Sequence, residues 1–224
     1  MKKRILVVFT FVLASIFAFP SFADDYIYFG GNYSLITTDG NSSQAIGANI
    51  SGIGDYGGLK KVYCAIGFAY DITGDRSFGI DEFEELGIDD IETNCFSIPI
   101  RFGYPIFCNI NDNMDFLIIP SLAFDFNFVS GSFDWEFLGY NIKYDFSGFG
   151  YTAGLDLNLG MQHKVGGMYF RYGIDFDMPF VSLLTVDIDY SGYISGSTSG
   201  SGSSSMADYF MLATTPYISF GFKF

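Results

Sequence analysis

The last eight residues of the chain alternate between large apolar side chains and small or polar ones. The apolar set is Ile218, Phe220, Phe222 and Phe224, and the intervening set is Tyr217, Ser219, Gly221 and Lys223. Side chains alternate in this way on a β-strand, whose period is two residues. A transmembrane β-barrel needs such a strand, because its last strand pairs with its first and turns an apolar face to lipid. The end of the chain therefore favours a barrel.

The N-terminus has the three parts of a secretory signal peptide. A basic start, Lys2 to Arg4, precedes an apolar run over residues 5–19 that is too short for a comfortable membrane span. The residues Ser21, Phe22 and Ala23 match a small-x-small cleavage site. We expect cleavage of residues 1–23, with 24–224 as one barrel domain. The alternative is an uncleaved anchor helix.

The composition of the expected mature chain limits its partners. Removal of residues 1–23 leaves 201 residues, with eight Lys and Arg against 25 Asp and Glu, a net charge of −17. Such an acidic chain would be repelled by nucleic-acid phosphates. Aromatic residues make up 20% of the sequence, which excludes an acidic disordered protein and suits the aromatic girdles of a membrane barrel.

A period of two recurs along the chain, without a sustained helical period or a run of 18 apolar residues. It predicts seven clear strands, and an even strand number requires an eighth. We place this weak strand near 77–86, where Phe78, Ile80 and Phe83 are its only support. The clear strands lie near 27–35, 62–72, 96–106, 116–128, 149–160, 168–180 and 208–224.

The predicted connections fall into two classes of length. Short turns are expected at 73–76, 109–113 and 162–167, and long loops at 38–58, 87–94, 130–145 and 183–207. Short periplasmic turns and long outer loops are typical of a transmembrane barrel. We therefore predict an all-β, eight-stranded antiparallel up-and-down barrel, with both termini in the periplasm.

The polarity of the strand faces indicates which face meets lipid. One face carries large apolar residues almost throughout, whereas the other carries mainly small and polar ones. Small residues suit the crowded lumen of an eight-stranded barrel. A soluble sandwich or a soluble ligand-binding barrel is the alternative.

The face predicted to line the lumen carries a few charged residues. A buried arginine needs carboxylates or other hydrogen-bond partners, so a plug of ion pairs is expected, and a selectivity constriction is the alternative. With a turn centred near 164–165, Asn158 would lie opposite Arg171 and Asp156 would lie one diagonal step away. The lumen candidates are Arg101, Asp125, Asp156, Arg171, Asp175 and Asp177.

Catalytic and metal sites have little support in the sequence. The one histidine, His163, is expected in a periplasmic turn, and the spacing of Asp175 and Asp177 is ordinary strand alternation. We predict no catalytic residue, no cofactor and no metal ligand. The acidic stretch 81–92 is expected to be solvated, with weak binding of Ca²⁺ or Mg²⁺ as the alternative.

Three cysteines, Cys64, Cys95 and Cys108, have no metal-site spacing. Cys64 is expected to pack as a small hydrophobe, and a Cys95–Cys108 disulfide would have to join two ends of one extended strand.

Two of the predicted outer loops have unusual compositions. Residues 195–205 contain only Gly, Ser and Thr, which predicts a flexible coil, either a tolerated surface segment or an exposed adhesive loop. The loop at 130–145 contains Phe133, Trp135, Phe137, Leu138 and Tyr140. We expect these residues to extend the flanking strands or to lie at the membrane interface, and a ligand contact is the alternative.

Together these features resemble the small outer-membrane β-barrel proteins, the OmpA-barrel, OmpX and OmpW-like group. The resemblance rests on the signal peptide, the alternating segments, the strand from Phe96 to Tyr104, which is similar to an xIPxxxxY strand, and the terminal Phe224. Ser219 departs from the group, in which glycine is common there. The resemblance implies insertion by the β-barrel assembly machinery, with Phe220, Phe222 and Phe224 as the C-terminal assembly signal.

This resemblance names no substrate, because barrels of this group serve different functions. Our first hypothesis is a non-enzymatic outer-membrane protein whose long acidic loops contact an extracellular ligand or a host surface. The alternative is a narrow channel or transporter for small, including hydrophobic, solutes.

Overall fold

The structure is a computed structural model that describes residues 26–38, 41–56, 59–73, 92–137, 140–192, 195–205 and 211–223. Its antiparallel strands are β1 (Tyr26–Thr38), β2 (Asn41–Tyr56), β3 (Leu59–Asp71), β4 (Glu92–Gly103), β5 (Ile106–Asn111), β6 (Met114–Phe137), β7 (Tyr140–Val165), β8 (Met168–Gly192), β9 (Gly196–Ser205) and β10 (Met211–Lys223). No helix among the described residues is long and apolar enough to cross a membrane.

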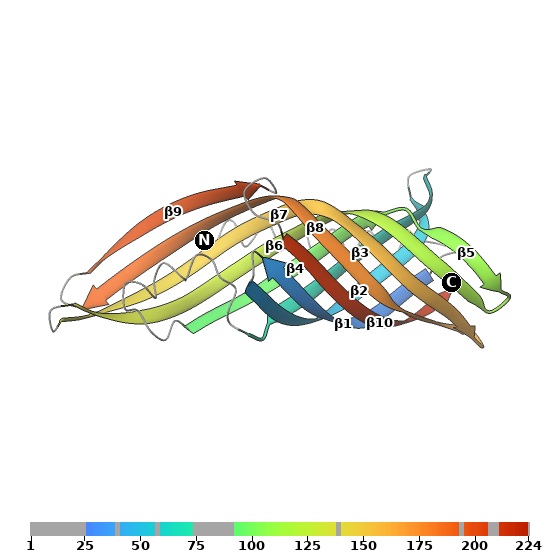
Figure 1. The fold of residues 1–224 in the computed structure, drawn as a ribbon, viewed down its shortest axis with the longest axis horizontal. Helices are drawn as coiled ribbons and strands as arrows, with labels where there is room; N and C mark the ends of the chain where they lie inside the picture. Colours follow the sequence, from blue (N-terminus) through green and yellow to red (C-terminus); the bar gives the residue numbers. More distant parts are fainter. Residues whose placement is uncertain are drawn as a thin grey trace.

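Eight of the described strands form a closed ring in the order β1, β2, β3, β4, β6, β7, β8 and β10 (Figure 1). The ring closes where β10 pairs with β1 on one side and with β8 on the other. Phe29 lies opposite Phe220, and Phe220 lies opposite Phe170, so the closure runs through the C-terminal strand. The predicted eight-stranded antiparallel barrel is confirmed.

One ring strand differs from the prediction. Residues 38–58, predicted as a loop, contain the whole of β2, which pairs with both β1 and β3. The predicted weak strand at 77–86 lies outside the described residues, and the ring closes without it. Strand β2 shows little alternation of large apolar residues, because Ile46 and Ile50 are separated by Ala48 and flanked by Gln44 and Gly52 on the same face. A pattern search based on large side chains misses such a strand.

Because β2 is an additional strand between β1 and β3, β3 runs in the direction opposite to the one predicted for residues 62–72. Ile53 lies opposite both Tyr26 and Tyr63, so β3 begins at the same end of the barrel as β1 and ends at the opposite one. Thr73 therefore follows β3 at the end away from both termini. The prediction assumed that residues 62–72 run toward the termini, and β3 runs the other way. Residues 74–76 of the predicted turn lie outside the described residues.

The turn between β7 and β8 is shorter than predicted. Val165 lies opposite Met168, which leaves a two-residue turn at Gly166 and Gly167 in place of the predicted 162–167. Gly166 has a φ of 65°, a left-handed conformation that glycine adopts without steric cost. His163 thus belongs to strand β7 and not to a turn.

The Gly- and Ser-rich segment is a strand in the structure. Strand β9 pairs with β8 in continuous register from Ser205 opposite Val181 to Gly196 opposite Tyr190. The prediction of a flexible coil is wrong here, because composition takes no account of the partner strand, whose backbone supplies the hydrogen bonds.

Strands β6, β7 and β8 are much longer than the rest of the ring. They contain 24, 26 and 25 residues, whereas β1, β3 and β10 contain 13 each. About a dozen extra residues correspond to roughly 40 Å along a strand. With β9 on the edge of β8, the long strands continue past the ring as one sheet, seen at the left of Figure 1. We call this extension the protruding sheet, formed by residues 130–137, 140–148, 184–192 and 196–202.

Two paired glycines make room for a tyrosine inside the barrel. Gly160 on β7 lies opposite Gly173 on β8. A Cβ atom at Gly160 would meet the Tyr217 hydroxyl at 2.3 Å, and one at Gly173 would meet the Leu159 carbonyl oxygen at 2.2 Å. The Tyr217 side chain therefore lies on the inner wall of the barrel, over the backbones of the two neighbouring strands β8 and β7.

We expect Gly173→Ala to destabilise the barrel by about 1–3 kcal/mol, because its Cβ clashes with rigid backbone atoms. The matched control is Gly200→Ala, at a glycine with no atom within 4 Å of its added Cβ. The stability of both variants is measured by heating samples to a series of temperatures before electrophoresis. The temperature at which the folded band is replaced by the unfolded band is then compared. An equal loss in both would contradict the packing argument.

Candidate functional site

The charged residues singled out from the sequence lie on β4, β6, β7 and β8, and each of them is buried or partly buried. One cluster centres on Arg101 of β4. Its guanidinium donates to Asp125 Oδ1 at 2.6 Å and also to the carboxylate of Asp177. Thr152 donates from its hydroxyl to the other oxygen of Asp125, at 3.3 Å. One arginine thus links carboxylates of β6 and β8 across the intervening strand β7.

A second cluster centres on Arg171 of β8, whose side chain is 1% exposed. Its Nη2 donates to Asn158 Oδ1 at 2.6 Å, and its Nε donates to the Tyr217 hydroxyl at 3.1 Å. Three tyrosine rings surround the guanidinium, with ring centres at 5.1 to 5.6 Å from Cζ; they belong to Tyr28, Tyr63 and Tyr217. A desolvated guanidinium is stabilised by such aromatic faces as well as by its hydrogen bonds.

Sequence reasoning missed this tyrosine cage. Tyr28, Tyr63 and Tyr217 fall on faces that otherwise carry small residues, and that contrast was the available signal. A large phenolic side chain inside a narrow barrel must find a hydrogen-bond partner or a cation.

The predicted register between β7 and β8 is wrong. Gln162 lies opposite Arg171, and Asn158 lies opposite Asp175, because the turn is centred two residues later than assumed. Arg171 nevertheless reaches Asn158, since its long side chain extends along the lumen. Asn158 in turn donates from its amide nitrogen to Asp175.

Asp156 lies between the two clusters and is 3% exposed. It lies opposite Asp177 on β8 and Ser121 on β6. Its Oδ1 is buried without a hydrogen-bond partner in the described part of the chain. The structure thus brings Arg101 together with Asp125 and Asp177, while Arg171 contacts amide and phenol groups.

Apolar side chains fill the lumen next to Arg171, toward the ends of the chain. Tyr28, Leu117 and Ile119 are all 0% exposed, and Gln162 is 1% exposed and hydrogen-bonded to the Tyr28 hydroxyl. Tyr28, Leu117 and Ile119 form the buried apolar cluster of the barrel together with Ile53, Tyr63 and Ala65. A barrel of eight strands is just wide enough for side chains to fill its interior, as they do at this level.

The outer surface of the ring is apolar, and it is bordered by aromatic side chains. One row crosses four neighbouring strands, with ring centres 5.7, 4.6 and 5.2 Å apart along Phe68, Phe96, Phe128 and Phe149. A second contact, between Phe170 and Phe220 at 5.2 Å, lies near the chain ends. We call the first set the upper aromatic row.

The separation of these two levels fits a bilayer. On β7, Phe149 belongs to the upper row and His163 lies opposite Phe170, so 14 residues separate the levels. At about 3.3 Å per residue and a tilt near 45°, these span roughly 33 Å. The hydrocarbon core of a bilayer is about 30 Å thick.

Above the upper aromatic row the polarity of the two faces is reversed. The outward positions of the long strands become polar and exposed, and they include Asp134, Lys143, Asp145, Asp187 and Asp189. The face continuous with the lumen becomes apolar, and Phe133, Tyr144 and Tyr190 form a row of rings 4.7 and 6.0 Å apart on it. Ile142 on the same face is 6% exposed. Aromatic residues predicted in the loop at 130–145 thus extend β6 and β7.

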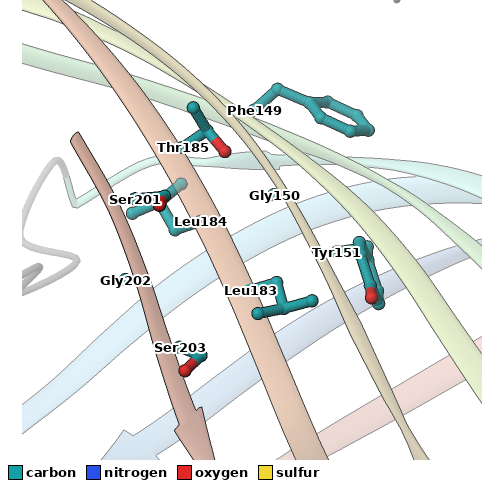
Figure 2. Close-up of a pocket in the computed structure, with 9 residues that line it drawn as sticks. All are labelled: Phe149, Gly150, Tyr151, Leu183, Leu184, Thr185, Ser201, Gly202 and Ser203. Carbon is teal, nitrogen blue, oxygen red and sulfur yellow. The ribbon is translucent and has the colours of Figure 1, made fainter. Parts of the chain in front are cut away.

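A pocket lies on the outward face at the base of the protruding sheet. Figure 2 shows Phe149 and Tyr151 on β7, Leu183 and Thr185 on β8, and serines of β9 around it. Its volume is about 350 Å³. Ser201 and Ser203 lie opposite Thr185 and Leu183, so β9 forms one wall.

The remaining predicted positions are placed as follows. Phe220 and Phe222 are 50% and 41% exposed on the outer surface, and Phe224 lies outside the described residues. The acidic stretch 81–91 also lies outside them. Cys64 is buried without a disulfide, and His163 stacks on Tyr172 of the neighbouring strand.

Known proteins resemble the chain in fold and not in sequence. No family model and no curated protein matches it. Among solved structures it is similar to Neisserial surface protein A, at 9% identity and a TM-score of 0.44, over 90% of this chain and 98% of that one.

Two further similar structures are a major outer membrane protein from Thermus thermophilus and the attachment invasion locus protein Ail of Yersinia pestis. The first has 12% identity and a TM-score of 0.45, over 88% of this chain and 99% of that one. The second has 13% identity and a TM-score of 0.39, over 90% and 99%. These structures belong to the group named from the sequence, and at such scores they carry no argument about function.

We expect Arg101→Met to cost about 3–5 kcal/mol, because it leaves Asp125 and Asp177 as unpaired carboxylates in the lumen. The matched control is Lys143→Met, which removes an ion pair to Asp145 at 3.2 Å that is more than half exposed and is worth at most about 1 kcal/mol. The stability loss of each variant is measured as the shift in the urea concentration at which half of the protein is unfolded. Neutralising both partners in Arg101→Met/Asp125→Asn/Asp177→Asn should recover much of the loss, and no recovery would contradict the pairing.

Proposed function

We propose that the protein is a non-enzymatic bacterial outer-membrane β-barrel with a filled lumen, and that its protruding sheet makes contacts at the cell surface. The observation that carries this proposal is the reversal of polarity along β6, β7 and β8. Below the upper aromatic row the outward face is apolar, as lipid requires, and above it the outward face is polar, as water requires. A soluble barrel would not need this change within one continuous strand.

The proposed orientation places both termini in the periplasm and the protruding sheet outside the cell. In support, Tyr26 and Lys223 pair at one end of the barrel, where β7 and β8 are joined by a two-residue turn. Short turns on the periplasmic side are typical of outer-membrane barrels. Export through the signal peptide of residues 1–23 and insertion by the β-barrel assembly machinery, through Phe220, Phe222 and Phe224, belong to the same proposal.

The proposed contacts are with an extracellular ligand or a host surface. The outward face of the protruding sheet carries the exposed Asp134, Asp145, Asp187 and Asp189, with Lys143 paired to Asp145. Such a surface favours a basic partner by charge complementarity and disfavours an acidic one.

Accessibility of single cysteines tests the orientation. In a Cys64→Ala/Cys95→Ala/Cys108→Ala background, we expect a membrane-impermeant maleimide to label Asp187→Cys on intact cells. We expect Lys164→Cys, exposed beside the β7–β8 turn, to be labelled only after the outer membrane is permeabilised. The opposite pattern would reverse the orientation, and release of the chain by carbonate washing would refute the membrane assignment.

A planar-bilayer experiment tests the filled lumen. Because Arg171, Leu117 and Ile119 are buried at one level, we expect no reproducible conductance from the purified barrel. Tyr28→Ala/Tyr63→Ala, which empties part of that level, serves as the positive comparison. Reproducible solute-dependent openings of the unmodified barrel would favour the channel or transporter that the sequence left as the alternative.

A further inference from the structure

Asp156 differs from the other carboxyl groups of the two arginine clusters in its bonding. Asp125 and Asp177 accept hydrogen bonds from Arg101. Asp175 accepts one from a side-chain amide. Asp156 is 3% exposed, and its Oδ1 atom is buried without a hydrogen-bond partner in the described part of the chain. A carboxylate that is ionised there has lost its hydration and gained nothing in return, which is costly.

The groups around Asp156 make its ionisation still less favourable. Asp177 lies directly opposite it on β8, and like charges in this relation repel. Ser121 lies opposite it on β6, but its hydroxyl is directed at a backbone carbonyl oxygen 3.5 Å away. The other titratable groups that act on Asp156 are Tyr63 of β3, Arg101 of β4, Asp125 of β6 and Asp175 of β8. The one cation among them, Arg101, is already paired with two carboxylates.

A metal cation and a proton are the two ions that could neutralise this carboxyl group. A hard cation such as Ca²⁺ takes about six to eight oxygen ligands. The part of the chain that the structure describes has no group of three or more acidic, histidine or cysteine side chains that could hold a metal ion. A proton needs no such set and no space beyond the carboxyl group itself. The enclosed position of Oδ1 therefore favours a proton.

We propose that Asp156 is a proton-binding site within the barrel, and that its carboxyl group stays protonated at neutral pH. Asp177 is placed to accept its hydrogen bond, because Arg101 engages Asp177 through Oδ2 and leaves Oδ1 available. Two carboxyl groups that face each other in a dry site share one proton because both cannot ionise together. The packing of the lumen thus depends on one bound proton, in either orientation of the barrel in the membrane.

Infrared spectroscopy of the full chain in phosphatidylcholine nanodiscs tests for the proton directly. A protonated carboxyl group has a C=O stretching band that is separate from the carboxylate bands and shifts in D₂O. We expect this band at neutral pH in the unmodified barrel and in Asp187→Asn, a control at an exposed carboxylate. We expect Asp156→Asn to remove it or to reduce it by the share that Asp156 contributes. Absence of the band from the unmodified barrel, or an unchanged band in Asp156→Asn, would overturn the proposal.

Stability provides a second readout, with a matched pair of variants inside the barrel. Asp156→Asn replaces a neutral acid by a neutral amide of nearly the same shape, so we expect an unchanged urea midpoint at neutral pH. Asp125→Asn makes the same change at a carboxylate paired with Arg101 and should lower the midpoint. An equal loss in both variants would show that Asp156 is ionised and would contradict the proposal.

The bound proton also gives the barrel a pH dependence of known sign. Aspartates of the unfolded chain have released their protons by neutral pH, whereas the folded barrel keeps the proton of Asp156. A folded state that binds more protons than the unfolded one loses stability as the pH rises. We expect the urea midpoint to fall more steeply toward alkaline pH in the unmodified barrel than in Asp156→Asn. Equal slopes, or stabilisation by Na⁺ or Ca²⁺ that only Asp156→Asn lacks, would refute a bound proton.

Discussion

Closure of the ring by β10 is the constraint on which the rest of the structure depends. In lipid, each backbone N–H and C=O group must be paired within the protein, so a sheet can span the bilayer only if it has no free edge. The C-terminal strand meets this need twice, because it pairs with β1 and with β8. Every other ring strand pairs with the ring strands next to it in the chain, so this closure removes the last free edges of the ring.

The small lumen that results from eight strands explains the interior chemistry. Arg101 and Arg171 are held in different ways: the first between two carboxylates, the second by an amide, a phenol and three aromatic faces. Glycines opposite each other, such as Gly160 and Gly173, leave the space that the tyrosines occupy. The interior therefore serves as a packed core whose polar groups are mostly bonded across strands, with Asn32 Oδ1 and Asp156 Oδ1 among the buried exceptions in the described part of the chain.

The protruding sheet has the opposite pattern of face polarity, because its outward face meets water and not lipid. Along one strand such as β7, outward residues pass from apolar at Leu155 and Tyr151 to charged at Asp145 and Lys143. The opposite face changes the other way, from Asp156 in the lumen to Tyr144 above it. A single strand thus obeys the pattern of a membrane barrel in one half and that of a water-soluble sheet in the other. The pocket beside β9 lies where the two patterns meet.

The sequence by itself determined the barrel architecture and the closing strand, since these depend on local alternation. Alternation identified seven strands, and only the requirement for an even number raised the count to eight. The alternation at Phe220 and Phe222, or at Asp175 and Asp177, is visible without any partner strand. Only the tertiary structure decided the identity of β2, the β7–β8 register, the tyrosine cage and the pairing of β9. These depend on contacts between strands: a strand of small residues such as β2 or β9 is defined by its neighbours' backbone, and a two-residue shift in a turn changes every cross-strand pair.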